Sequence, residues 1–164
     1  MIFKTFWRKK QIKTDKITVI ESQTDIFRYK TRIETRFADF DLMGHVNNVT
    51  YFTYFEIGRS KYWEQAIQWN WKNTGLVIRQ AAADYILPVF PDDDVHVYVR
   101  TSRIGKSSFD LEYLLVKNEQ GKEITCCKGK TICVAFDYQS RKPIPIPGIE
   151  RQKMIEFESL HDSA

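Results

Sequence analysis

The sequence predicts an α+β domain in which one long helix faces an antiparallel sheet of about five strands. Three observations support this prediction. One segment repeats apolar residues with helical spacing, several segments alternate with the period of two that is typical of strands, and short turns separate them. The chain has 164 residues, which is enough for one domain with a substantial hydrophobic core.

The first strand and the helix follow each other along the chain. The strand is expected over 29–37, where aromatic and β-branched residues alternate with charged ones. The helix is expected over 49–69, about 20 residues and roughly 30 Å long. Gly58 lies inside it, where we expect the helix backbone to approach the sheet closely. The apolar face of the helix repeats at spacings of three and four through Phe52, Phe55, Tyr62, Trp63 and Ala66.

The second half of the chain is rich in strands. Pro88 closes the first of these segments, which has a mostly buried pattern, and NEQGK predicts a hairpin turn. Alternating prolines make 141–148 extended but unsuited to a central strand. Residues 1–27 lack periodicity, so we expect an N-terminal extension over 1–27 and a domain over 28–160. The remaining elements are strands over 75–87, 95–105, 107–117 and 122–137, and a terminal helix over 149–160.

Composition excludes several classes of protein. Hydrophobic residues make up 43% of the chain and aromatic residues 14%, which argues against disorder. The net charge of +4 is too small and too scattered to indicate nucleic-acid binding. No apolar stretch reaches membrane-spanning length, and we expect no membrane contact. Cys126, Cys127 and Cys133 have no zinc-ligand spacing, so we expect buried free thiols, no metal site and a cytoplasmic protein.

The segment before the helix, DFDLMGHVNN over 39–48, has more polar groups than a turn requires. We interpret it as an active-site loop. A carboxylate can act as a nucleophile or as a general base, and the first turn of a helix offers free N–H groups and a positive dipole end. Gly44 predicts a positive φ, and Asn47 or Asn48 is the expected N-cap. Asp39 is expected to bond to the loop or to Arg36.

Three blocks of the chain resemble the hotdog-fold thioesterases of the 4-hydroxybenzoyl-CoA thioesterase type. The blocks are RFADFDLMGHVNNVTYFTYFEIGR over 36–59, DYILPVFPDDDVHVYVRTSRIGKSSFDLEY over 84–113 and KGKTICVAFDYQSRKPIPIP over 128–147. The resemblance extends over roughly 30–157, and the Asp-x-Asp-x-x-Gly-His-Val-Asn-Asn spacing is its specific part. It implies a hotdog fold, with the sheet wrapped around one central helix, and hydrolysis of a thioester.

The resemblance also implies roles for individual residues. Asp41 corresponds to the catalytic carboxylate, as nucleophile or as general base, and Glu56 is the reserve candidate. Asn48 corresponds to the donor whose backbone N–H polarises the thioester carbonyl. His45 has a structural or water-orienting role more readily than that of a general base. The neighbouring residues expected to contact substrate are Gly44, Val46, Asn47 and Tyr51.

The expected substrate is an acyl-CoA or an acyl-carrier-protein thioester, with coenzyme A as part of the substrate and no cofactor. Its phosphates could be held by Arg103, Lys106 and Ser107, near Arg100 and Ser108, although solvated strand residues would have the same pattern. A homodimer or a dimer of dimers would hide an open sheet edge. Two other functions remain open: a hotdog dehydratase or hydratase, and a non-catalytic protein that binds acyl thioesters or lipids.

Overall fold

The computed structural model describes residues 24–72 and 74–160. Most of the expected N-terminal extension, residues 1–23, therefore lies outside the described residues. The described elements, in chain order, are the short helix η1 (Thr24–Ile26), β1 (Tyr29–Ile33), η2 (Phe37–Asp39), α1 (Thr50–Tyr62), the π-helical turn η3 (Trp63–Ile67), β2 (Gly75–Tyr85), β3 (Asp94–Ile104), β4 (Ser108–Glu119), β5 (Lys122–Asp137), β6 (Lys142–Pro143) and α2 (Gly148–Glu158).

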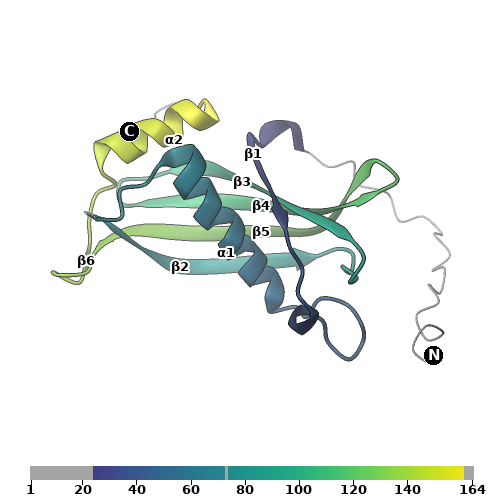
Figure 1. The fold of residues 1–164 in the computed structure, drawn as a ribbon. Coiled ribbons are helices and arrows are strands. Elements are labelled where there is room, and N and C mark those ends of the chain that lie inside the picture. The colour runs from purple at the N-terminus through teal and green to yellow at the C-terminus, as the bar shows by residue number, and fades with distance from the viewer. Residues whose placement is uncertain (1–23, 73, 161–164) are drawn as a thin grey trace, which may run out of the picture.

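The strands form one curved antiparallel sheet in the order β1-β3-β4-β5-β2, and the two-residue β6 pairs with β5. Helix α1 crosses one face of this sheet, and α2 lies beside the carboxyl end of α1 (Figure 1). The predicted α+β hotdog arrangement is confirmed. The last three long strands follow each other through short turns, whereas β2 reaches its place beside β5 only through long-range pairing.

Helix α1 packs closely on the sheet because two glycines make room. A Cβ atom on Gly58 would lie 2.7 Å from a methyl carbon of Val97, so the predicted close approach of the helix backbone is confirmed. Gly129 of β5 likewise leaves space for the Phe55 ring. The buried face agrees in part with the prediction. Phe55, Tyr62 and Trp63 are buried, whereas Phe52 and Ala66 are only partly buried. The structure buries Tyr51 and Tyr54 as well.

The helical segment ends earlier than its predicted boundary of 69. The α-helix stops at Tyr62, the π-helical turn continues it to Ile67, and Gln68 adopts a left-handed conformation with φ 53°. This turn buries both Trp63 and Ile67. The two residues are four positions apart, so they lie on the same face of the segment and enter the core together.

Strand β1 is shorter than predicted, because the expected strand over 29–37 ends at Ile33. Phe37 begins η2 and its side chain is 98% exposed. Reciprocal hydrogen bonds between Arg36 and Asp39 close this short turn. A local side-chain cap therefore competes successfully with the alternating pattern, which by itself favoured continuation of the strand.

The predicted burial of β2 is wrong. No residue of this strand is fully buried, and Ile78 and Tyr85 are 42% and 48% exposed. Its hydrophobic run suited a central strand, but the strand pairs only with β5 and forms an edge of the sheet. An apolar edge strand with unpaired backbone groups is a surface on which another chain can pair.

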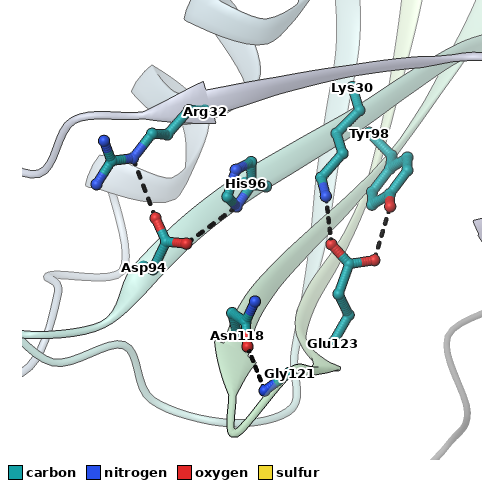
Figure 2. Close-up of polar contacts among 8 residues, drawn as sticks. All are labelled: Lys30, Arg32, Asp94, His96, Tyr98, Asn118, Gly121 and Glu123. Carbon is teal, nitrogen blue, oxygen red and sulfur yellow. Dashed lines mark hydrogen bonds and ion pairs between the residues drawn. The ribbon is translucent and has the colours of Figure 1, made fainter.

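The outer face of the sheet is polar near the β4–β5 hairpin, as Figure 2 shows. Glu123 accepts hydrogen bonds from Lys30 and from the Tyr98 hydroxyl, each at 2.6 Å, and so links β1, β3 and β5. The side chain of Asn118 accepts a hydrogen bond from the Gly121 amide in the hairpin turn, where φ of Gly121 is 82°. The predicted hairpin is confirmed, and β1 is attached to the sheet by side chains as well as by its backbone.

The predictions about the cysteines hold within the structure. Cys126, Cys127 and Cys133 are buried free thiols, and burial raises the pKa of each to about 12. Over residues 24–72 and 74–160, no group of three histidine, cysteine or carboxylate side chains could hold a metal ion. No helix in the same residues has the length and apolar character needed to cross a membrane.

Candidate active site

The loop before α1 is a compact turn closed by its own backbone. Phe40 and Val46 form an isolated antiparallel bridge, and the Asp41 amide donates to the His45 carbonyl at 3.0 Å. The Gly44 amide donates to the Asp41 carbonyl at 2.9 Å, and Gly44 has φ 81°. The predicted positive φ is confirmed. This geometry brings the side chains of Asp41 and His45 to the same side of the turn.

The carboxylate of Asp41 is accessible and only partly satisfied. Its Oδ1 accepts a hydrogen bond from the Met43 amide at 2.8 Å, and its Oδ2 lies 3.6 Å from Nδ1 of His45. The side chain is 28% exposed. Nδ1 of His45 also lies 3.2 Å from the Val46 carbonyl oxygen. One oxygen of Asp41 is therefore oriented by the loop, while the other stays beside an imidazole and open to a further partner.

Asp39, only two residues earlier, has the opposite environment. It is 2% exposed, and its carboxylate is bound by the Arg36 guanidinium, the Arg36 amide and the Tyr54 hydroxyl. Burial alone would raise the pKa of Asp39, but these hydrogen bonds outweigh it and hold the pKa below its usual value. The predicted contact with Arg36 is confirmed. This acid is structural, so Asp41 is the carboxylate that remains available for chemistry.

The start of α1 is organised by Asn47. Its side-chain oxygen accepts a hydrogen bond from the Val49 amide at 3.2 Å, and its carbonyl accepts one from the Thr50 amide at 2.9 Å. The N-cap position is Val49, so the expected cap at Asn47 or Asn48 is wrong by one or two residues. Among the described residues, the backbone N–H of Asn48 has no hydrogen-bond acceptor. It is therefore free to bind a ligand.

A cavity of about 310 Å³ lies beside the first turn of α1. The loop and the helix contribute one wall, and the end of β2 with the segment after it contributes the other. Asp41 is not on the wall itself, but its neighbour His45 is. The residues that line the cavity are His45, Val46, Asn48, Tyr51, Tyr85, Ile86, Leu87 and Pro88.

The structure thus brings together most of the loop residues predicted for the site. His45, Val46, Asn48 and Tyr51 line the cavity, whereas Gly44 and Asn47 shape the loop without forming its wall. The wall from Tyr85 to Pro88 was missed. Its sequence showed only the end of a strand before a proline, and no local signal indicated that it would lie beside a loop some 40 residues earlier.

This second wall is attached to the loop by its own backbone bonds. The Val46 amide donates to the Val89 carbonyl at 2.9 Å, and the amides of Ile86 and Leu87 both donate to the Cys126 carbonyl. Val89 is fully buried. The cavity therefore lies between two segments that are each attached to the same sheet, which makes its shape a property of the fold.

The basic residues predicted to hold phosphates lie elsewhere in the chain. Arg103 is near the end of β3, and Lys106 and Ser107 are in the β3–β4 turn. This turn lies next to α2 and to the carboxyl end of α1 (Figure 1). The loop with Asp41 is at the amino end of that helix. These residues do not line the cavity of their own chain, so their role in substrate binding stays a prediction.

The reserve candidate Glu56 is an exposed residue of α1. Its carboxylate lies 3.5 Å from the Arg59 guanidinium, as expected for a pair on one helix face. A separate cavity of about 250 Å³ lies on the outer face of the sheet beneath Ile26 and Phe27. Neither Glu56 nor any predicted site residue lines that second cavity.

Comparison with known proteins agrees with this architecture. The sequence profile of the thioesterase-like superfamily matches residues 35–155. The chain belongs to this superfamily. The matched residues include the Asp41 loop, α1 and all the long strands after it.

Individual relatives extend the comparison over most of the chain. An uncharacterised protein of Bacillus subtilis, YsmA, is 32% identical over 130 residues, which are 79% of this chain and 86% of YsmA. A thioesterase of Thermus thermophilus, crystallised with coenzyme A and zinc, is 31% identical with a TM-score of 0.71 and covers 82% of this chain and 97% of its own. The PA5185 protein of Pseudomonas aeruginosa is 26% identical with a TM-score of 0.73, over 81% and 93% of the two chains.

Proposed function

We propose that this protein hydrolyses acyl thioesters, with acyl-CoA as the substrate. The observation that carries the proposal is the cavity beside the first turn of α1, which Asn48 lines and which His45, another lining residue, connects to the Asp41 carboxylate. The Asn48 N–H has no acceptor among the described residues. Superfamily membership supports the reaction, and the Thermus relative crystallised with coenzyme A supports the thiol.

In the proposed reaction, Asp41 acts as a general base. Because Asp41 does not line the cavity itself but lies beside His45, which does, the proposed nucleophile is a water molecule between the carboxylate and the thioester. Asp41 takes a proton from this water as the oxygen bonds to the carbonyl carbon. The carbonyl oxygen becomes an oxyanion bound by the Asn48 N–H. The C–S bond then breaks, and the proton passes from Asp41 to the leaving thiolate.

Single turnover in ¹⁸O-labelled water distinguishes this route from attack by Asp41 itself. A general base leaves the Asp41 side chain unlabelled, and the ¹⁸O appears in the acid product. A covalent anhydride with Asp41 that is hydrolysed at the Asp41 carbonyl carbon would incorporate ¹⁸O into the carboxylate of the enzyme. Mass spectrometry of the peptide with Asp41 detects this label, and a labelled peptide would contradict our assignment.

The activity itself is tested by thiol release from a panel of acyl-CoA esters of different length and aromatic character. We expect turnover of at least one ester, lost in Asp41→Asn and kept in Asp92→Asn, which changes an exposed acid outside the site. Tight binding of these esters without hydrolysis by the unmodified protein would instead favour the non-catalytic alternative. Formation of an enoyl product from 3-hydroxyacyl thioesters would favour a dehydratase.

Arg103 and Lys106 do not reach the cavity of their own chain, so the proposed contacts for the phosphates of coenzyme A are these residues of a second copy of the chain. The variant Arg103→Ala with Lys106→Ala should raise KM for an acyl-CoA and leave KM for the same acyl group on N-acetylcysteamine unchanged, since that thiol has no phosphates. An equal effect on both substrates would show that these residues act on folding. The same comparison on an acyl-carrier-protein substrate tests the other proposed donor.

We also propose that the protein forms a homodimer through the edge strand β2. Half-exposed Ile78 and Tyr85 and the free backbone edge would be covered by a second copy of this strand. Light scattering should give a dimer or a multiple of it. The variant Ile78→Lys places a charge on this edge and should shift the protein toward monomer, whereas the same mass for both proteins would reject this interface.

A further inference from the structure

Tyr85 occupies a particular place at the candidate site. It is the last residue of β2, and its hydroxyl donates a hydrogen bond to the Asn48 carbonyl at 2.9 Å. Its ring packs edge to face against Tyr51, with ring centroids 5.1 Å apart and an interplanar angle of 80°. Both rings line the cavity of about 310 Å³. This is a side-chain link between the edge strand and Asn48, the residue proposed above as the oxyanion donor.

The two peptide groups that flank Asn48 are each bound on their carbonyl side. The Asn47 carbonyl accepts from the Thr50 amide at 2.9 Å, toward the first turn of the helix. Since C=O and N–H point in opposite directions in a trans peptide, the Asn48 N–H points away from that turn. The Asn48 carbonyl is bound by Tyr85 on the other side. With both planes bound, the backbone dihedrals of Asn48 are fixed.

We propose that Tyr85 is a positioning residue of this site, whose hydroxyl orients the Asn48 peptide so that the Asn48 N–H is directed at the carbonyl oxygen of the substrate. The inference rests on the thioesterase activity proposed above. Preorganised donors act because they need not reorient as charge develops on the oxygen. Loss of the Tyr85 hydroxyl would release the Asn48–Val49 peptide and leave the peptide that carries the Asn48 N–H held only by the bond from Thr50 to the Asn47 carbonyl. The donor would then be positioned less tightly, so the effect should fall on kcat more than on KM.

The chain supplies a matched control for this idea. Tyr138 also donates its hydroxyl to a backbone carbonyl of β2, that of Leu76, at 3.0 Å. Tyr138 is exposed as well, and Leu76 lies at the opposite end of the strand from Tyr85. Tyr85→Phe and Tyr138→Phe therefore each remove one bond from a tyrosine hydroxyl to a backbone carbonyl, and in each case one of the two partners lies on β2. Only the Tyr85 bond is at the site.

The experiment compares the two variants by kinetics. Tyr85→Phe should lower kcat about tenfold with KM within about twofold, as expected for loss of one neutral hydrogen bond that acts on the transition state. Tyr138→Phe should keep both constants within about twofold of the unmodified protein. Equal changes in kcat for the two variants would overturn the proposal, because a merely structural role would not distinguish them.

A second readout does not depend on activity. The amide ¹H–¹⁵N signal of Asn48, recorded for the protein without ligand, should move in Tyr85→Phe and stay in place in Tyr138→Phe. An Asn48 signal unchanged by Tyr85→Phe would overturn the positioning role, whatever the kinetics. If the signal moves and no thioester is hydrolysed by the unmodified protein, it is the proposed function that fails, while Tyr85 still orients this peptide.

Discussion

The two ends of α1 use polar groups in opposite ways. At the carboxyl end, the fully buried Tyr62 places its hydroxyl 2.9 Å from Oγ1 of Thr101 and 2.6 Å from the Glu158 carboxylate. The same carboxylate oxygen accepts from the Thr101 amide at 3.0 Å. These groups are enclosed where α2 meets the helix end and β3. At the amino end, Asp41 and the Asn48 amide lie at a cavity with bonding capacity to spare.

This difference shows which polar groups serve the fold and which are left for a ligand. A buried polar group costs free energy unless it is bonded, and at the carboxyl end Tyr62, Thr101 and Glu158 bond to one another. An exposed loop can leave a donor or a carboxylate oxygen open because water occupies it until a ligand arrives.

The largest expected effect is a loss of activity on substitution of Asp41, near the amino end of α1. Asp41→Asn should lower thioester hydrolysis about a thousandfold, because a positioned general base contributes roughly 10²–10⁴ in rate. The free energy of unfolding should change little, since the side chain is partly exposed and has one backbone partner. Initial rates and urea denaturation measure the two quantities. A strong loss of stability would place Asp41 with the enclosed groups.

Asp39 lies near the amino end of α1 but is buried and bonded, so its substitution should affect stability, as expected for the groups at the carboxyl end. Asp39→Asn should lower the free energy of unfolding by about 2 kcal/mol, because a buried acceptor for a charged partner is lost. The depressed pKa means that the ionised carboxylate stabilises the fold above its ordinary pKa of 3.8, and that this stability is lost as pH falls through the folded pKa.

Urea denaturation of the unmodified protein and of Asp39→Asn in acidic buffers measures how the free energy of unfolding depends on pH. The unmodified protein should lose stability below about pH 3.8, and Asp39→Asn should lack that part of the slope. Identical acid profiles for the two proteins would show that Asp39 does not stabilise the fold through its charge.

Glu158 should show the opposite pH dependence at the carboxyl end. Burial raises the pKa of Glu158 above its ordinary 4.5, so the folded state binds the proton more tightly than the unfolded state. Stability should therefore fall as pH rises from 4.5 through the raised pKa. Glu158→Gln should remove this pH dependence. Below pH 4.5, its free energy of unfolding should stay within about 1 kcal/mol of that of the unmodified protein.

A neighbouring residue provides the control for that measurement. Glu156 lies on the same helix, is exposed, and pairs with Gln152 at 2.8 Å. Glu156→Gln should keep the slope that Glu158→Gln removes. Neither variant should change thioester hydrolysis, and a fall in activity for Glu158→Gln alone would mean that the two helix ends are coupled.

The smallest expected effect concerns Glu56. This acid lies on the exposed face of α1 and pairs with Arg59 at 3.5 Å, which is a weak surface interaction. Glu56→Gln should change kcat by less than about twofold, and the free energy of unfolding by less than about 0.5 kcal/mol. A loss of activity comparable to that of Asp41→Asn would make Glu56 the catalytic acid and reverse our assignment of the site.

Sequence reasoning identified the element types and the loop well, but not the second wall of the site. The periodicity of α1 and of the β3–β5 strands is a local property, because each side chain's face follows from its place in the helix or strand. The Gly44 turn and the Asp39–Arg36 contact are local for the same reason. The wall from Tyr85 to Pro88 lies beside the loop only because β2 pairs with β5 at the sheet edge.

By itself, the sequence determined an α+β domain of one long helix, a terminal helix and about five strands, the position of a polar loop before the long helix, and the choice of Asp41 as the candidate carboxylate. Only the tertiary structure decided that β2 is an exposed edge, that Tyr85 reaches Asn48, and that the basic residues of the β3–β4 turn lie at the far end of the helix. The physical reason is that hydrophobic periodicity sets which face of an element is buried, whereas strand order depends on contacts between distant segments that leave no local pattern.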